Sequence, residues 1–163
     1  MPTSRLLHDP LIKKALENPL VAKEFFNMHL SNDIKALVDI NTLQLEKETF
    51  IEQSLRNSVS DILFSAKFGD NDGYIFLLVE HQSKPHHFMA FRLFKYMINI
   101  IDRYLTQHPK AKSLPLVYPI VFYNGKQKYN VSRNFWDLFM CDPKALYIAN
   151  RGYMRGELCY RGG

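Results

Sequence analysis

The feature that most restricts the fold is an unbroken apolar run of six residues from Tyr74 to Val79. A strand covered on one face alternates apolar and polar side chains, whereas a strand covered on both faces is apolar throughout. The turn-forming sequence Gly69-Asp70-Asn71-Asp72-Gly73 comes directly before the run. The run therefore predicts a central strand that enters the sheet from a tight turn.

The segments around this strand predict a mixed α/β protein with layers of helix and sheet. In chain order, the expected elements are helices from Asp9 and over 20–30, strands within 40–51, 59–68 and 74–79, a helix from Pro85 to His108, and a strand over 116–123. Proline lacks a backbone N–H, so Pro119 places the last strand at a sheet edge or a bulge. Residues 1–145 are expected to form one domain, followed by a glycine-rich, poorly packed tail over 146–163.

Composition narrows the class of partner. The 163 residues carry a formal net charge of +5, which favours a polyanionic partner, of which nucleic acid such as DNA is the commonest. Cys141 and Cys159 are not in a CxxC pair, so neither a zinc site nor a disulfide framework is predicted, and a reducing cytoplasm is the expected compartment. No apolar stretch is long enough for a membrane span. Pairing with a second copy as a homodimer is left open.

Two acidic residues flank the predicted hairpin. If Phe68 pairs with Gly73 across a four-residue loop, then Asp61 stands opposite Glu80. Gln82 lies two residues beyond Glu80 and so shares its face. Two adjacent carboxylates repel each other, and a divalent cation bound between them would offset this repulsion. Mg²⁺ binds a few carboxylates together with water and substrate phosphates, and Mn²⁺ is an alternative.

A solvated acid pair at the end of a hairpin is the competing interpretation of Asp61 and Glu80. The placement of both residues favours the metal site, because Glu80 directly follows the apolar run and Asp61 begins a largely apolar stretch. Acidic residues in such places are more often functional than incidental.

The predicted helix after the strand carries a polar stripe. Arg92, Tyr96, Asn99 and Arg103 recur at intervals of four, three and four residues, which places them on one side of a helix. An arginine on this stripe could meet a DNA phosphate. The competing interpretation is an amphipathic helix whose solvent face happens to carry two arginines, and the sequence does not decide between them.

These residues resemble one bacterial family, the recombination-promoting nuclease/putative transposase family, also called YhgA-like. The resemblance covers about residues 7–145 and rests on five blocks in order, namely His8-Asp9-Pro10, Ser60-Asp61, residues 77–83, residues 89–97 and residues 114–119. It implies a PD-(D/E)XK, restriction-endonuclease-like core of the order αβββαβ, with a central mixed sheet flanked by helices. It also implies that Asp61 and Glu80 bind the metal and that Gln82 stands where many such nucleases have lysine.

The function expected from this resemblance is a metal-dependent DNA endonuclease that promotes recombination and is associated with mobile elements. Glutamine cannot supply the charge of lysine, so Gln82 can only orient water or a phosphate oxygen. The alternative is a truncated, catalytically inactive remnant that still binds DNA. A transposase in the strict sense would need a third carboxylate, and only Glu17 or Glu24 on the opening helices is available.

Overall fold

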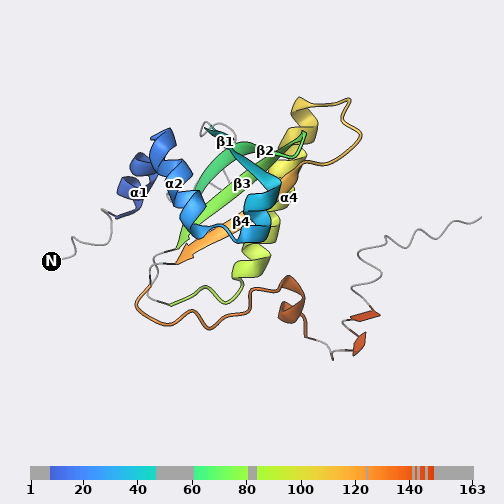
Figure 1. The fold of residues 1–163 in the computed structure, drawn as a ribbon. Helices are drawn as coiled ribbons and strands as arrows, with labels where there is room; N and C mark the ends of the chain where they lie inside the picture. Colours follow the sequence, from blue (N-terminus) through green and yellow to red (C-terminus); the bar gives the residue numbers. More distant parts are fainter. Residues whose placement is uncertain are drawn as a thin grey trace, which may run out of the picture.

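Four strands form one mixed sheet in the order β1-β2-β3-β4 (Figure 1). The structure is a computed structural model that describes residues 8–46, 61–80, 84–123, 125–140, 142, 144–145 and 147–148. The strands are β1 (Val38–Leu45), β2 (Asp61–Phe68), β3 (Asn71–Glu80) and β4 (Leu116–Tyr123). β3 pairs antiparallel with β2 and parallel with β4, so the apolar run is the central strand that its composition predicted.

The β2–β3 hairpin has a tighter turn than the sequence suggested. Phe68 pairs with Asn71, which leaves only Gly69 and Asp70 in the loop. Gly69 has a φ of +60°, a conformation that glycine adopts without steric cost and that suits the first central position of a two-residue hairpin. The residues Asn71 to Gly73, expected to belong to the turn, therefore open β3 instead.

Three short helices precede the sheet, namely α1 (His8–Leu16), α2 (Pro19–His29) and α3 (Asn32–Leu37). The start of α2 is fixed by Asn18, whose side-chain oxygen accepts a hydrogen bond of 3.0 Å from the Leu20 N–H, and by Pro19 at the first helical position. Ser31 caps α3 in the same way through the Ile34 N–H. The sequence predicted α1 and α2 but not α3, whose six residues are too few to show a period.

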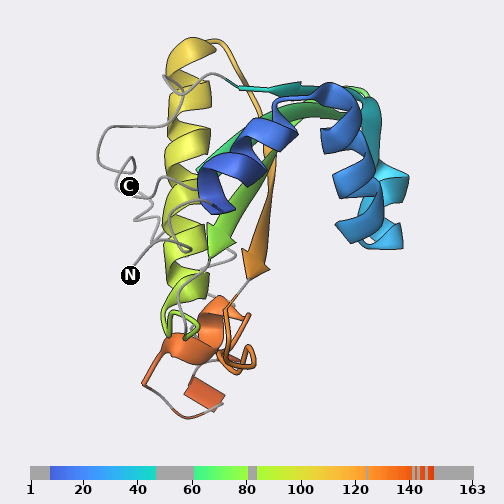
Figure 2. The same ribbon diagram turned by 90° about the vertical axis from the view of Figure 1, so that its left-hand side faces the viewer.

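The long helix α4 (Met89–Gln107) connects β3 to β4 and covers the opposite face of the sheet (Figures 1 and 2). Side chains of α1 and α2 pack on one face of β2 and β3, where the rings of Phe26 and Phe64 meet at 5.1 Å. Side chains of α4 pack on the other face, where Tyr96 lies against Phe76 with ring centroids 4.9 Å apart. Two apolar layers therefore cover the central strand.

The predicted order of elements is confirmed, and the α/β fold with helices flanking a mixed sheet is compatible with a PD-(D/E)XK-like core. Pro119 lies on β4, which is an edge strand, as expected. The expected strand within 40–51 is β1, and residues 47–51 lie outside the described residues. A short 3-10 helix, η2 (Phe135–Leu138), follows the sheet and was not predicted.

Candidate active site

Asp61 is the only charged residue that is buried among the residues that the structure describes, with 7% of its surface exposed. It is the first residue of β2 and lies on the same face of the sheet as Leu63, which belongs to the layer beneath α4. Burial of a carboxylate costs free energy unless a charge or a hydrogen-bond donor compensates. Asp61 is therefore the residue of this sheet whose placement most requires a functional explanation.

The expected pairing of Asp61 with Glu80 is wrong. Asp61 pairs with Leu78, because the two-residue turn shifts β3 by two positions relative to β2. A register shift of two residues does not change which face of the sheet a position belongs to. The position of Glu80 is therefore still on the same face as Leu78, two residues further along β3. Its backbone pairs with Tyr123 of β4. The side chain of Glu80 and all of Gln82 lie outside the described residues.

Tyr96 of α4 lies beside Asp61, and Arg92 of the same helix contacts Tyr96. The Arg92 Nε donates a hydrogen bond of 3.2 Å to the Tyr96 hydroxyl, and the guanidinium carbon lies 5.5 Å from the Tyr96 ring centroid. Burial raises the pKa of the Tyr96 hydroxyl above its usual value, and the nearby Asp61 carboxylate raises it further, while Arg92 opposes the shift. The phenol therefore stays protonated at neutral pH and can donate a hydrogen bond.

The polar stripe of α4 does not form a solvent face. Tyr96 is buried against the sheet, and Arg92, Asn99 and Arg103 are half-buried. Arg103 lies eleven residues beyond Arg92, which is about 16 Å along the helix axis. The structure thus brings Tyr96, with Arg92 bound to it, to Asp61 and leaves Arg103 toward the other end of α4.

The described side chains around Asp61 supply only part of the ligand set that a divalent cation such as Mg²⁺ needs. Carboxylate oxygen is the ligand type that Mg²⁺ prefers, and Asp61 is held at a strand end by the ladder with Leu78. Among the described residues, no group of three or more His, Cys, Asp or Glu side chains could hold a metal ion. The two further residues expected in the site, Glu80 and Gln82, fall outside that search.

A cavity of about 630 Å³ opens at the edge of β4, at the same end of the sheet as Asp61. Tyr118 and Tyr123 of β4 line it together with Tyr129 and Arg133 of the segment after β4, and the Arg133 guanidinium carbon lies 5.6 Å from the Tyr129 ring centroid. Tyr129 in turn packs edge-on against Tyr123 at 5.3 Å. The sequence analysis did not identify this group, although Lys126, Lys128 and Arg133 form a basic segment there.

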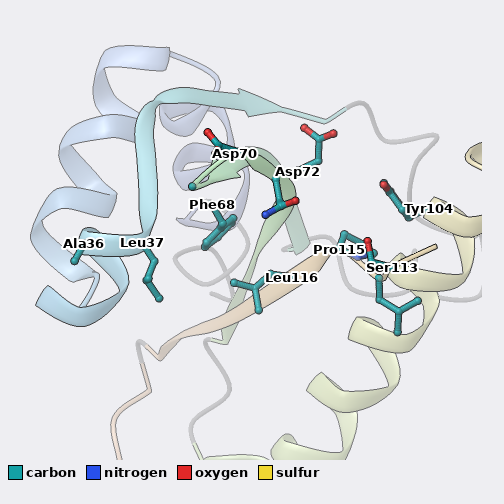
Figure 3. Close-up of a pocket in the computed structure, with 12 residues that line it drawn as sticks. Ala36, Leu37, Phe68, Asp70, Asp72, Tyr104, Ser113, Pro115 and Leu116 are labelled. Carbon is teal, nitrogen blue, oxygen red and sulfur yellow. The ribbon is translucent and has the colours of Figure 1, made fainter. Parts of the chain in front are cut away.

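A second cavity, of about 650 Å³, lies at the opposite end of the sheet around the β2–β3 turn (Figure 3). Asp70 and Asp72 of the hairpin line it, together with Ser113 and Tyr104. The Asp72 carboxylate forms an ion pair of 2.7 Å with Lys67. Two acidic residues at its mouth disfavour a phosphate, so a nucleic acid is better accommodated at the Asp61 end.

The order αβββαβ and a buried acid at the start of the second strand are compatible with the class of restriction-endonuclease-like folds. Within that class the chain belongs to the family described as "Putative transposase, YhgA-like", whose model matches residues 7–154. The match runs past the domain boundary expected at Ala145. The chain matches no solved structure.

Three curated relatives come from Escherichia coli. The recombination-promoting nuclease RpnD of strain O157:H7 is 41% identical over 125 residues, which are 77% of this chain and 48% of that protein. RpnC of strain K12 is 39% identical over 145 residues, 88% of this chain and 47% of that protein. The inactive nuclease-like protein RpnE of K12 is 39% identical over 133 residues, 81% of this chain and 44% of that protein. The chain thus spans about half the length of these relatives.

Among the described residues, none of the helices is both long enough and apolar enough to cross a membrane.

Proposed function

We propose that this chain is a metal-dependent DNA endonuclease that promotes recombination and is associated with mobile elements. The names of RpnD and RpnC, together with membership of their family, support nuclease chemistry. The observation that carries the proposal is the buried Asp61 carboxylate with Tyr96 beside it, whose hydroxyl accepts a hydrogen bond from Arg92. A buried acid next to a protonated phenol that is itself bound to a cation is the kind of perturbed, charged group that functional sites contain.

Asp61 and Glu80 are proposed to hold Mg²⁺ or Mn²⁺. Such a metal, when bound, activates water and stabilises the charge that develops on a phosphodiester. The chain itself would position the substrate: Gln82 would hold the attacking water or a phosphate oxygen through its amide. It adds no charge, because an amide is neutral at all relevant pH values.

Arg92 is proposed to contact the scissile phosphate or its neighbour. A guanidinium binds phosphate oxygens through paired N–H donors, and the hydrogen bond to Tyr96 fixes its orientation. Tyr96, kept protonated by burial and by Asp61, serves as a fixed donor rather than as a base. Arg103 lies farther along the same stripe and would support the DNA backbone away from the reacting bond.

DNA is proposed to reach the site from the β4 edge. The cavity with Arg133 and Tyr129 is at that end of the sheet, whereas the acidic cavity is at the other. Contacts of this type bind the DNA backbone without reading base sequence. We propose the cytoplasm as the compartment of this activity, because that is where a DNA substrate would be available.

The second candidate function is DNA binding without cleavage. It is favoured by RpnE, a relative at 39% identity whose name describes it as inactive. The glutamine at position 82, in place of the lysine expected for many nucleases of this class, points the same way. Under this alternative Arg92 and Arg133 still bind phosphate, but the bond is not broken.

A plasmid-nicking assay tests the proposal. Supercoiled plasmid is incubated with the protein and Mg²⁺ or Mn²⁺, and the nicked form is followed over time. The wild type should nick, Asp61→Asn should not, and Asp72→Asn should nick at the wild-type rate because Asp72 lies at the other end of the sheet. DNA retention by an inactive wild type would support the second candidate and overturn the first.

A further inference from the structure

The outer side of α4 carries large apolar residues at a regular spacing. Phe91, Phe94, Ile98, Ile101 and Leu105 are separated by three, four, three and four residues. Four of them are between 37% and 52% exposed, and Ile101, at the border of this side, is half-buried and also packs against the layer beneath α4. We call these five residues the α4 seam. The opposite side of the helix, including Met89, Tyr96 and Ile100, is already buried against the sheet.

A helix that is apolar on two sides usually has a partner on each side. The spacing of the seam averages 3.5 residues, which is the repeat by which one helix packs along another in a coiled coil. In Figure 2, α4 runs along one side of the molecule, with the sheet beside it. Part of the seam already has a partner, because the Phe135 ring of η2 stacks on Phe94 at 4.6 Å and on Phe91 at 6.4 Å.

We infer that the α4 seam pairs with the same seam of a second copy of this chain, with the two helices antiparallel. In this arrangement Ile98 packs against Ile101 of the second copy, and Phe94 against Leu105. Phe91 and the stacked face of the Phe94 ring remain with Phe135 of η2, and the exposed 44% of Phe94 meets the second copy. The contact is self-complementary, as a twofold dimer requires, because each residue and its partner exchange roles.

Charge supports a second copy and the antiparallel direction. Lys95 and Asp102 are exposed and each directly follows a seam residue, Phe94 and Ile101 respectively. Antiparallel helices bring like flanking positions together, so Lys95 lies near Asp102 of the second copy, and symmetry repeats the pair. Parallel helices would instead place each of these charges near Met97 or Tyr104, which are uncharged. The inference does not depend on the proposed nuclease activity.

Sedimentation velocity over a range of protein concentrations tests the inference. The wild type should be a dimer at about 100 µM, and Ile98→Asp should be monomeric, because a buried interface does not tolerate an unpaired charge. Lys95→Asp should weaken the dimer on the order of ten-fold in Kd, since two symmetric attractions become repulsions. Lys110→Asp makes the same charge change outside the seam and should leave Kd unchanged.

The charge-swapped variant Lys95→Asp/Asp102→Lys separates this model from a general loss of folding. It should recover the dimer, because the antiparallel pair is restored with its signs exchanged. A wild type that stays monomeric overturns the inference, as it would if another part of the protein covered the seam. The inference is also overturned if Ile98→Asp remains a dimer. It is overturned as well if Lys95→Asp/Asp102→Lys dissociates as readily as Lys95→Asp alone.

Discussion

The most direct test of the candidate site is the metal-dependent stability of Asp61→Asn. Asparagine has almost the same shape as aspartate, but it carries no charge and binds Mg²⁺ poorly. In the metal-free protein two effects oppose each other: the substitution removes the cost of burying a carboxylate that is 7% exposed, and it also weakens the interaction of this side chain with the Tyr96 hydroxyl. The metal-free melting temperature should therefore change little, by about 3 °C or less in either direction.

With metal present, the wild type and the variant should diverge. A ligand at about ten times its Kd stabilises the native state by about 1.4 kcal/mol. For a chain of this length each kcal/mol shifts the melting temperature by about 2–4 °C, so Mg²⁺ or Mn²⁺ should raise that of the wild type by about 3–6 °C. Asp61→Asn should lose this gain.

Thermal unfolding followed by circular dichroism, with and without Mg²⁺, measures both quantities. Asp72→Asn is the matched control, because it makes the same chemical change at an exposed acid at the other end of the sheet. It should keep the full metal-dependent gain. An equal gain in the wild type and in Asp61→Asn would refute the assignment of Asp61 as a metal ligand.

Four further outcomes are expected. Gln82→Ala should slow plasmid nicking by about 10²–10³, and Gln82→Lys should retain more activity; equal rates for alanine and wild type would remove Gln82 from the site. DNA affinity, measured by fluorescence anisotropy, should fall steeply with salt, and salt-insensitive binding would exclude phosphate contacts. Gly73→Ala should destabilise the fold by about 1–3 kcal/mol in a urea titration, because its Cβ would lie 2.8 Å from a Phe68 ring carbon and 2.9 Å from the Leu116 carbonyl oxygen. Burial, and then Glu46, raise the pKa of Tyr74 to about 12, so stability that is present below pH 10 should be lost as pH rises toward 12, and Tyr74→Phe should reduce that loss.

The sequence predicted the central strand and the order of elements because both depend on long, strong patterns. The apolar run of β3 and the long helix α4 are each decided by many residues acting together. The helix α3 was missed because its six residues hold less than two turns of pattern. The prediction of a four-residue turn was wrong because it did not consider that Gly69 by itself supplies the positive φ that a two-residue loop needs.

The candidate site was predicted in part for the same reasons. Asp61 could be chosen from the sequence because an acid beginning an apolar strand is unusual. Its partner position was off by two residues, because register depends on the turn and not on strand composition. The burial of Tyr96 and Arg92 could not be predicted, because the outer seam of α4 is as apolar as the side that faces the sheet. Periodicity alone does not say which of two apolar sides is inside.

The parallel pairing of β3 with β4 has a consequence for the order of folding. The β2–β3 hairpin closes a loop of two residues, whereas Glu80 of β3 and Leu116 of β4 are separated by 35 residues that include the whole of α4. Closing a long loop costs more chain entropy and is slower, so the hairpin should form first. Asp61 would then be in place on its strand early, while Tyr96 reaches it only when α4 docks. Amide hydrogens of the hairpin should accordingly become protected from exchange with solvent before those of β4.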